Sequence, residues 1–346
     1  MTTPSLLPER ARILIVRLRR LGDLLLLTPA LRAIRQTYPN AQIDVLVLEG
    51  FHAALLDNPD IDHLIVVRRG QLGWLAAMLA CARGRYHAVL DYQSSPRSLW
   101  FILAAHAKVR LGWRKRGMRD WVYTRHAPGW DEPIYVARNF VRFAALIGIP
   151  STSDLRLAIA MTAADRQCTE DMFKRAGIDP GRPIIALSVA SQVDRKRWPP
   201  ERYAELADSL IRANLGQLVF TNGPGEIGQV RAVVDRMREK PALWDYGSTT
   251  LAGLASIYEH CHLWIGNDGG AKHVATAAGC PTLVIIKAGD ERFWTDTTDP
   301  SQIAVCDPQP ELRDPNSLEG ITVMQVLDVA TRAIDRLRST RRVPQR

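Results

Sequence analysis

A glycine and an aspartate, Gly22 and Asp23, stand where the apolar run Arg12–Leu18 gives way to a helical pattern, and Arg19 and Arg20 directly precede them. A carboxylate in the first turn of a helix gains about 0.3–1 kcal/mol from the partial positive charge there, so one interpretation is purely structural. The other is that Gly22 tightens the turn and presents Asp23 to a substrate hydroxyl as a general base. Spacing alone does not decide between them.

Two later turns carry residues suited to an anionic ligand. Lys196 and Arg197 precede a helix that begins at two prolines, where free backbone N–H groups and a cation suit a phosphate. Asp268 and the pair Gly269–Gly270 begin another helix, with His273 one turn inside it. Each turn alone also fits a solvated loop, and His273 alone fits an ordinary half-buried histidine. Together they predict a diphosphate site.

A third turn, Thr221–Gln229, places Glu226 near the start of a helix. A carboxylate there can bond ribose hydroxyls, as acids that follow strands in nucleotide-binding sheets do. As an acid at a helix start it also needs no function. No GxGxxG sequence follows the first apolar run, which argues against a dehydrogenase.

The elements that must position these residues alternate between strand and helix. Strands are predicted at 12–18, 41–50, 63–69 and 86–93, and again at 182–190, 217–223, 263–268 and 281–287, with amphipathic helices between most of them. This alternation predicts an α/β chain with two doubly wound parallel sheets, joined near 148–159. Ligands in such sheets bind beyond the carboxyl ends of the strands, here in a cleft between the two sheets.

The charge of the chain is concentrated in its first half. The 346 residues carry a net charge of +9, and residues 1–160 hold 22 Lys and Arg against 12 Asp and Glu. This predicts an anionic partner for the first half, with a solvated basic face as the alternative. No nucleic-acid recognition motif is present, so no nucleic acid is expected. The start of the chain lacks a signal-peptide pattern, and a cytoplasmic location is expected.

Three stretches resemble glycosyltransferase family 9, the lipopolysaccharide heptosyltransferases. They are "ILIVRLRRLGDLLLLTPALRAI" with the sequence that follows it to Ile65, "KRWPPERYAELA" from Lys196, and "IGNDGGAKHVATAAGCPTLVI" from Ile265. The stretch "VLDYQSSPRSLWFILAAHAKVRLGW" from Val89 also fits the family. The resemblance extends from about residue 12 to residue 335 and keeps the three signatures in order.

This resemblance implies a GT-B fold, two Rossmann-like domains that face each other across a cleft. Residues 1–155 would form the acceptor-binding domain, 156–335 the nucleotide-sugar-binding domain, and 336–346 a basic tail. The implied activity is inverting transfer of a heptose or related sugar from an ADP-sugar, such as ADP-heptose, to an anionic lipopolysaccharide-core or related bacterial glycan. No obligatory cofactor and no metal are expected.

The resemblance also implies roles for individual residues. Asp23 is the expected catalytic base. The residues expected at the donor nucleotide-sugar are Ser191, Lys196, Glu226, Thr249, Asp268, Gly269, Gly270 and His273. Apart from the resemblance, the charge of the first half leads us to expect an anionic acceptor at Arg19, Arg20, Gly22 and Arg97.

Four short segments depart from the family pattern and keep other functions open. They are Arg19–Arg20, Ser188–Ala190, Gly269 and Ile286–Gly289. One alternative is a non-catalytic GT-B protein that only binds a nucleotide-sugar or glycan, and another is a sugar-nucleotide epimerase. Because the expected acceptor is lipid-linked, peripheral contact with the inner membrane is a further expectation, at Arg114–Arg125 with its Trp121 and Tyr123.

Overall fold

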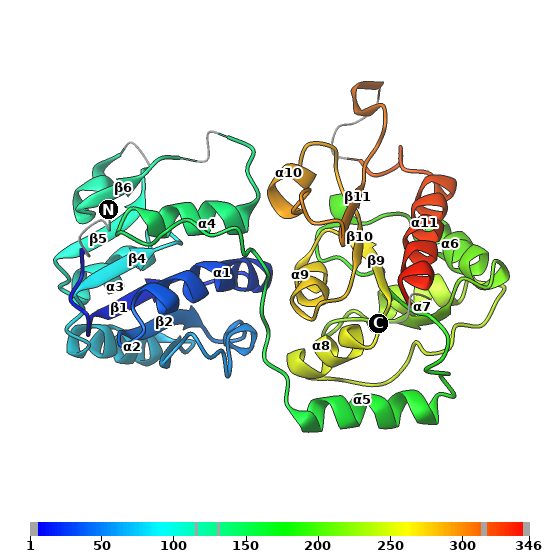
Figure 1. Cartoon of the computed structure of the whole chain (residues 1–346), viewed down its shortest axis with the longest axis horizontal. Helices are drawn as coiled ribbons and strands as arrows, with labels where there is room; N and C mark the ends of the chain where they lie inside the picture. The colour runs from blue at the N-terminus through cyan, green and yellow to red at the C-terminus, as the bar shows by residue number, and fades with distance from the viewer. Residues whose placement is uncertain (1–5, 115–116, 130–131, 313–316, 342–346) are drawn as a thin grey trace. The chain divides into compact units, whose positions relative to one another are not determined.

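The computed structural model describes residues 6–114, 117–129, 132–312 and 317–341. The chain divides into two compact units, Met1–Ala160 and Met161–Arg346 (Figure 1). Each unit has one parallel sheet with helices on both faces, which confirms the prediction of two Rossmann-like α/β domains. Within the described ranges, no helix combines the length and the apolar character needed to cross a bilayer.

Unit 1 is built on a six-stranded parallel sheet in the order β3-β2-β1-β4-β5-β6. Helices α1 and α4 pack together on one face, and α2 and α3 on the other. The strands are β1 (Arg12–Val16), β2 (Gln42–Leu48), β3 (His63–Val67), β4 (Ala88–Asp91), β5 (Val109–Trp113) and β6 (Arg125–Ala127). The helices are α1 (Leu21–Thr37), α2 (Gln71–Arg83), α3 (Ser98–Ala104) and α4 (Val136–Ala145), with 3-10 turns at His52–Ala54 and Met118–Val122.

Strand β1 lies at the centre of this sheet, which explains its uninterrupted apolar run. It pairs with β2 on one side and with β4 on the other, where Val16 is opposite Asp91. The chain changes direction across the sheet at this point, so the loops that follow β1 and β4 both leave the same edge. The predicted acceptor arginines lie on these two loops, and the predicted base lies in the first turn of α1, directly after the first loop.

Unit 2 is built on a five-stranded parallel sheet in the order β11-β10-β9-β7-β8. The strands are β7 (Ile184–Ser188), β8 (Gln217–Phe220), β9 (Leu263–Asn267), β10 (Thr282–Ile285) and β11 (Gln302–Val305). The helices are α5 (Ala163–Arg175), α6 (Pro200–Arg212), α7 (Ile227–Val234), α8 (Leu251–Glu259), α9 (Gly270–Ala277), α10 (Glu291–Trp294) and α11 (Val323–Arg341), with 3-10 turns at Asp194–Lys196 and Pro310–Leu312.

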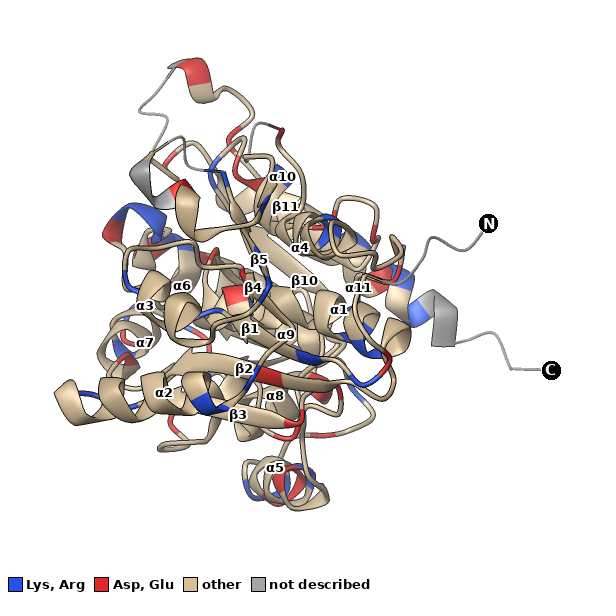
Figure 2. Ribbon diagram, turned by 90° about the vertical axis from the view of Figure 1, so that its left-hand side faces the viewer, with Lys and Arg blue, Asp and Glu red and all other residues tan. Residues whose placement is uncertain are grey.

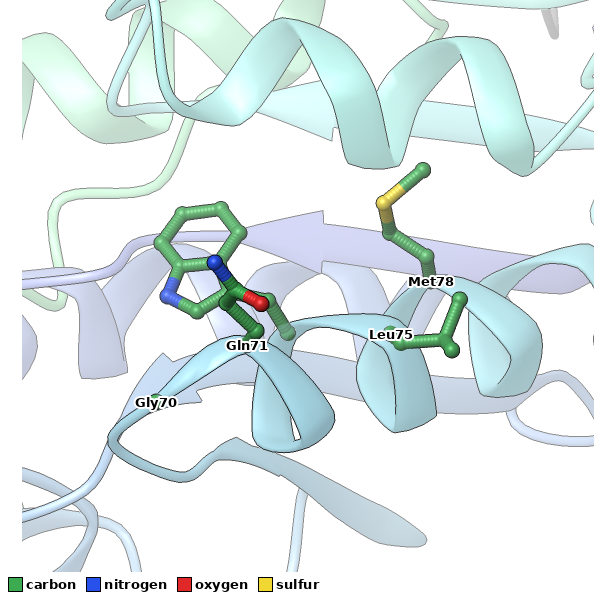
Figure 3. Close-up of a pocket in the computed structure, with 5 residues that line it drawn as sticks. Gly70, Gln71, Leu75 and Met78 are labelled. Atoms are coloured by element: carbon green, nitrogen blue, oxygen red, sulfur yellow. The ribbon is translucent and has the colours of Figure 1, made fainter.

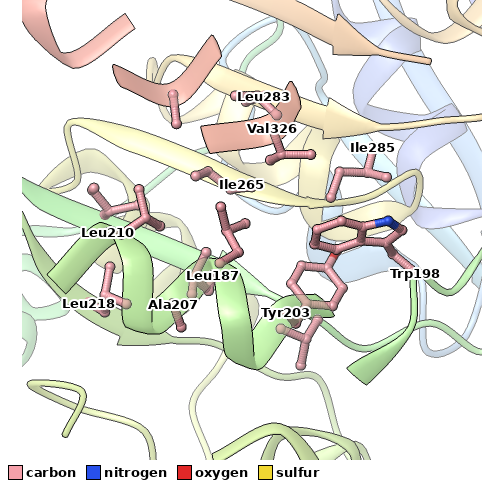
Figure 4. Packing of buried hydrophobic residues seen from close by; sticks show 14 of the residues in the cluster. Leu187, Trp198, Tyr203, Ala207, Leu210, Leu218, Ile265, Leu283, Ile285 and Val326 are labelled. Atoms are coloured by element: carbon pink, nitrogen blue, oxygen red, sulfur yellow. The ribbon is translucent and has the colours of Figure 1, made fainter. Parts of the chain in front are cut away.

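The main core of unit 2 lies between the sheet and helices α6, α7 and α11. Trp198 is fully buried there and meets Tyr203 edge to face, with ring centroids 4.9 Å apart (Figure 4). Its indole nitrogen donates to the carbonyl of Ile321 at 2.9 Å. The loop that carries Lys196 is therefore anchored at its end by a buried tryptophan.

Helix α11 extends further than the sequence pattern indicates. The basic segment 336–346 was expected to form a tail, but the helix continues to Arg341. Arg338 helps to explain this, because its guanidinium donates to the carbonyls of Asn214 and Leu215 at 3.1 and 3.2 Å. Residues 342–346 lie outside the described residues.

Candidate functional site

Asp23 is the third residue of α1, at the edge of the sheet where β1 ends. Its Oδ2 atom lies 2.6 Å from Nη2 of Arg17 and accepts a hydrogen bond from the backbone nitrogen of Arg20 at 3.2 Å. The carboxylate therefore does stabilise the helix start, as the structural interpretation expects. Its side chain keeps 15% exposure, and the second oxygen, Oδ1, takes no part in these contacts. Gly22 lies in the first turn of α1 and is not among the glycines with positive φ.

Arg17 holds Asp23 in place and is not among the predicted site residues. It is 9% exposed, and Nη1 donates to the carbonyl of Tyr92 at 2.5 Å. Its guanidinium also lies 5.3 Å from the ring centroid of Phe140. A buried cation requires a partner of opposite charge, and Asp23 supplies it. The signal in the sequence is the lone charge inside the apolar run "ILIVRL".

We expect Arg17→Met to lower the free energy of unfolding by about 2 kcal/mol, because Asp23 would keep its charge without a partner in a half-buried site. Denaturant unfolding followed by circular dichroism measures this loss. The control is Arg142→Met, which removes an exposed pair with Glu132 and should change stability by less than about 0.5 kcal/mol. Equal effects of the two substitutions would contradict the assignment of Arg17 as the support of Asp23.

The loop after β4 supports the loop after β1. The Oε1 atom of Gln93 accepts hydrogen bonds from the backbone nitrogens of Leu18 and Arg19, at 3.2 and 3.4 Å. Arg19 and Arg20 are exposed, as is Arg97, which directly precedes α3. The structure thus places the three predicted acceptor arginines on loops that leave neighbouring strands, with their side chains in solvent.

A buried carboxylate organises the loop that carries Arg97. Asp91 is fully buried and accepts from the hydroxyls of Ser98 and Tyr123, both at 2.7 Å, and from the backbone nitrogen of Ser94 at 2.9 Å. Burial raises the pKa of Asp91, and these hydrogen bonds act in the opposite direction. The expectation that Tyr123 stands beside surface cations is wrong, because it is 6% exposed and bonded to Asp91, whereas Trp121 is 71% exposed.

In unit 2, the loop after β7 and the start of α9 meet through an ion pair. The ammonium group of Lys196 contacts the carboxylate of Asp268. Asp268 is buried, and the Lys196 side chain is 33% exposed. Two residues that lie 72 positions apart in the chain, each predicted for the donor site, are thereby brought into direct contact.

Asn267, the last residue of β9, fixes the geometry of this pair. Its side-chain amide donates to the carbonyl of Val189 at 2.8 Å, and its Oδ1 accepts from the backbone nitrogen of Trp198 at 2.9 Å. Both ends of the loop after β7 are thus bonded to one buried side chain, 3% exposed. Asn267 is not among the predicted site residues, although it adjoins Asp268 in the quoted signature.

A cavity of about 190 Å³ lies at the carboxyl ends of β9 and β10. Lys196 and Asp268 line it, together with Arg195, Lys287 and Asp290. Three cations face two carboxylates, so the charged lining has a positive balance. A cavity of this composition suits a compact anion such as a diphosphate.

The start of α9 lies beside this cavity. Gly269 precedes the helix with an extended backbone, φ −170°, and Gly270 is the first helical residue. No described atom lies within 4 Å of the position of a Cβ on Gly269, so a residue with a side chain would have room there. The departure from the family pattern at this position is therefore not forced by packing.

His273 is buried one turn into α9, 3% exposed. Burial lowers its pKa well below the ordinary value, and the charges of Lys272 and Lys196 lower it further, so the ring is neutral near pH 7. Its Nδ1 atom is buried without a hydrogen-bond partner among the described residues. This nitrogen is enclosed by unit 2, and His273 is not among the described residues that line the cavity beside Lys196.

Lys272, the neighbour of His273, is a fully buried lysine that the sequence interpretation did not single out. Its ammonium group donates to the carbonyl of Trp294, and the Thr295 hydroxyl and the Gln302 Oε1 lie 3.3 Å from it. These contacts attach α9 to the segment that follows α10. Burial lowers the pKa of Lys272 to about 8, and nearby carboxylates, first that of Asp268, act in the opposite direction.

We expect Lys272→Met to change how stability depends on pH. Between about pH 8 and pH 10.5 the unfolded state still binds the lysine proton that the folded state has released, so stability rises with pH in the parent relative to the variant. The slope approaches about 1.4 kcal/mol per pH unit in this window. Denaturant unfolding of both proteins at pH 7, 8, 9 and 10 measures the difference. A difference that is constant across the series would contradict the lowered pKa.

Of the three remaining predicted donor residues, two make hydrogen bonds within their own turns and one is exposed. The Ser191 hydroxyl donates to the carbonyl of Val193 at 3.1 Å. Glu226 directly precedes α7, and its Oε2 accepts from the backbone nitrogen of Gly223, in the preceding turn, at 2.8 Å. Thr249 is exposed before α8. These three are not among the described residues that line the cavity beside Lys196.

Comparison with known proteins gives a consistent set of relatives. The family described as glycosyltransferase family 9 (heptosyltransferase) matches residues 76–321. Lipopolysaccharide heptosyltransferase 3 of Escherichia coli K12 is 25% identical over 294 residues, which cover 80% of this chain and 83% of the relative.

Two solved structures have similar folds. A glycosyl transferase family 9 protein from Veillonella parvula DSM 2008 aligns with a TM-score of 0.82 at 25% identity, covering 96% of this chain and 100% of that one. The ADP-heptose LPS heptosyltransferase II of Escherichia coli aligns with a TM-score of 0.76 at 20% identity, covering 94% and 99%. The similarity therefore spans both units.

Proposed function

The chain belongs to glycosyltransferase family 9, and we propose that it transfers a heptose or a related sugar from an ADP-sugar to an anionic glycan of the lipopolysaccharide core. The observation that carries this proposal is the pairing of Lys196 with Asp268 in a cavity of net positive charge. The name of the Escherichia coli relative, which specifies ADP-heptose, supports the choice of donor. The exposed cations Arg19, Arg20 and Arg97 of unit 1 favour an anionic acceptor.

In the proposed reaction Asp23 acts as the base. An acceptor hydroxyl loses its proton to the free Oδ1 of Asp23 as its oxygen bonds to the anomeric carbon of the donor. The bond from that carbon to the diphosphate breaks at the same time, so ADP leaves with the electron pair and the anomeric configuration inverts. Arg17 keeps the carboxylate oriented through Oδ2. Arg19, Arg20 and Arg97 are proposed to attract the acceptor, which would bind beside Gly22.

Negative charge develops on the diphosphate as it leaves. We propose that Lys196 and the backbone N–H groups at the start of α9, at Gly269 and Gly270, stabilise this charge. His273 is also proposed for the donor site, where a local rearrangement of α9 would bring its buried Nδ1 to the donor. Glu226 is proposed to meet the ribose, and Ser191 and Thr249 the remaining donor groups. Cations and helix ends can stabilise a leaving diphosphate without a metal, so we predict that chelators do not abolish transfer.

The proposed place of action is the cytoplasmic face of the inner membrane, since the proposed acceptor is lipid-linked. Of the segment first considered for membrane contact, Arg114–Arg125, residues 115–116 lie outside the described residues. Trp121 is exposed and remains a candidate for such contact.

The test combines purified protein, ADP-heptose and core oligosaccharide, and follows ADP release and the mass of the acceptor. Transfer adds one heptose mass to the acceptor for each ADP released. Tight binding of the ADP-sugar without consumption would indicate the non-catalytic alternative. Conversion of the donor to an isomer without any acceptor would indicate an epimerase. Either outcome would overturn the proposed transfer.

A further inference from the structure

Helices α2 and α3 of unit 1 expose large apolar side chains that the proposed reaction does not use. Leu72, Leu75 and Leu79 on α2 are 83%, 53% and 44% exposed, and Trp100 and Leu103 on α3 are 62% and 37% exposed. We call these five residues the α2–α3 face. Soluble proteins rarely leave so many neighbouring apolar side chains in water unless they contact another surface.

The apolar side chains of α2 form one stripe along the helix. Leu72, Leu75 and Leu79 follow each other at spacings of three and four residues, while Ala77 and Cys81 are buried toward the sheet. The helix covers 13 residues, and its charged residue, Arg83, is the last of them. A helix that is apolar on both its buried and its exposed side is not built for a solvent-facing position.

The face is already formed in the isolated unit. The indole of Trp74 on α2 stacks on the ring of Phe101 on α3, with centroids 4.8 Å apart and an interplanar angle of 28°. A shallow hollow of about 490 Å³ lies along α2, and Figure 3 shows Gln71, Leu75 and Met78 projecting beside it. The two helices are therefore held together, and their outer side chains are presented as one surface.

Exposed cations lie at the ends of these two helices. Arg68 and Arg69 directly precede α2, Arg85 follows it shortly after Arg83, and Lys108 follows α3. The sequence from 63 to 119 contains 11 Lys and Arg and a single acid. That acid is Asp91, which is fully buried. Figure 2 shows α2 without an acidic residue along its length.

We infer that the α2–α3 face docks unit 1 on an anionic phospholipid bilayer. Leucines and a tryptophan can enter the boundary between headgroups and acyl chains, while the arginines at the helix ends remain at the level of the phosphates. Each basic residue near such a surface contributes about 1 kcal/mol of attraction. The inference rests on the proposed function in one respect: a lipid-linked acceptor would bring the protein to a membrane.

The charge pattern favours a bilayer over a second copy of the chain. Two copies meeting through this same face would place arginines near arginines, and the exposed carboxylate of Glu49, which accepts from the backbone nitrogen of Arg69 at 3.2 Å, is outnumbered by them. A bilayer with anionic headgroups offers a continuous negative surface beside an apolar interior, which matches both components of the face.

The experiment measures binding of the full chain to vesicles of phosphatidylcholine alone and of phosphatidylcholine mixed with phosphatidylglycerol. We expect binding to the mixed vesicles, weakened by added salt, and little binding to the neutral ones. The variant L72Q/L75Q/L79Q should bind the mixed vesicles about 100-fold more weakly, from the lost apolar contact. The variant R68Q/R69Q/R83Q should lose about 100-fold as well, from three lost charges.

Matched substitutions in unit 2 serve as controls. Met324→Gln alters a side chain that is 80% exposed, and K174Q/R175Q/R212Q removes three exposed cations, and both should bind like the parent. The leucine and the arginine variants, which we call the two α2 variants, should transfer sugar to a lipid-free oligosaccharide at the parental rate. This result separates the inference from the proposed function. Parental vesicle binding by either α2 variant, or no vesicle binding by the parent, would overturn the inference. A parental dimer that the leucine variant loses, without vesicle binding, would identify a second copy instead.

Discussion

Replacing Asp23 with asparagine is expected to lower kcat for sugar transfer by about 10²–10⁴-fold, the usual contribution of a general base. Asparagine keeps the size of the side chain and can still accept from the backbone nitrogen of Arg20, but it cannot take a proton at Oδ1. Donor affinity should change little, because the residues proposed for the donor all lie in unit 2. Steady-state kinetics with ADP-heptose and a calorimetric titration with ADP measure the two quantities.

The control for this substitution is Asp57→Asn, an exposed aspartate of unit 1 with φ 55° that asparagine tolerates well. It should leave kcat unchanged. Unfolding curves of Asp23→Asn are needed beside the kinetics, because the substitution also leaves Arg17 without its carboxylate partner. Transfer at the parental rate by a folded Asp23→Asn protein would exclude Asp23 as the base.

Replacing Lys196 with methionine is expected to lower kcat/KM for the donor by about 10²–10³-fold, because the leaving diphosphate would lose a cation proposed to stabilise it. The same change should lower the free energy of unfolding by about 1–3 kcal/mol, since the buried carboxylate of Asp268 would lose its partner. Kinetics and denaturant unfolding of the same protein preparation give both numbers.

The double variant K196M/D268N separates these two effects. Asparagine at 268 removes the unpaired charge, so most of the lost stability should return, while activity should stay low because the cation is still missing. Arg175→Met, an exposed cation of the same unit, is the control and should behave like the parent. Recovery of activity together with stability would mean that Lys196 acts only as a structural partner of Asp268.

Much of the architecture could be predicted from the sequence because its signals are local. The alternation of apolar strands and amphipathic helices predicts two parallel sheets, and ligand-binding loops follow the carboxyl ends of strands in such sheets. Asp23, Lys196 and Asp268 were identified in this way, and the structure places the last two in contact. Their catalytic and binding roles remain predictions.

The supporting residues could not be predicted because their partners are distant in the chain. In the sequence, Arg17 is only a residue of a predicted buried strand. Its partners, the carbonyl of Tyr92 and the ring of Phe140, become evident only in the structure. Lys272 reads as an ordinary helical lysine until Trp294 and Gln302 surround its ammonium group. Tyr123 was wrongly placed at the surface, since its bond to Asp91 depends on the pairing of β4 with β5 and the turn that follows it.

The hydrogen bonds of the Asn267 side chain should reduce the conformational entropy that the protein loses when a nucleotide binds. Because one side chain bonds Val189 and Trp198, the two ends of the loop between them are held in place before any nucleotide arrives. The backbone amide of Trp198 should accordingly exchange with deuterium as slowly as those of the adjoining strand, even in the empty protein. A nucleotide then meets a preorganised receptor, and association loses little conformational entropy on the protein side.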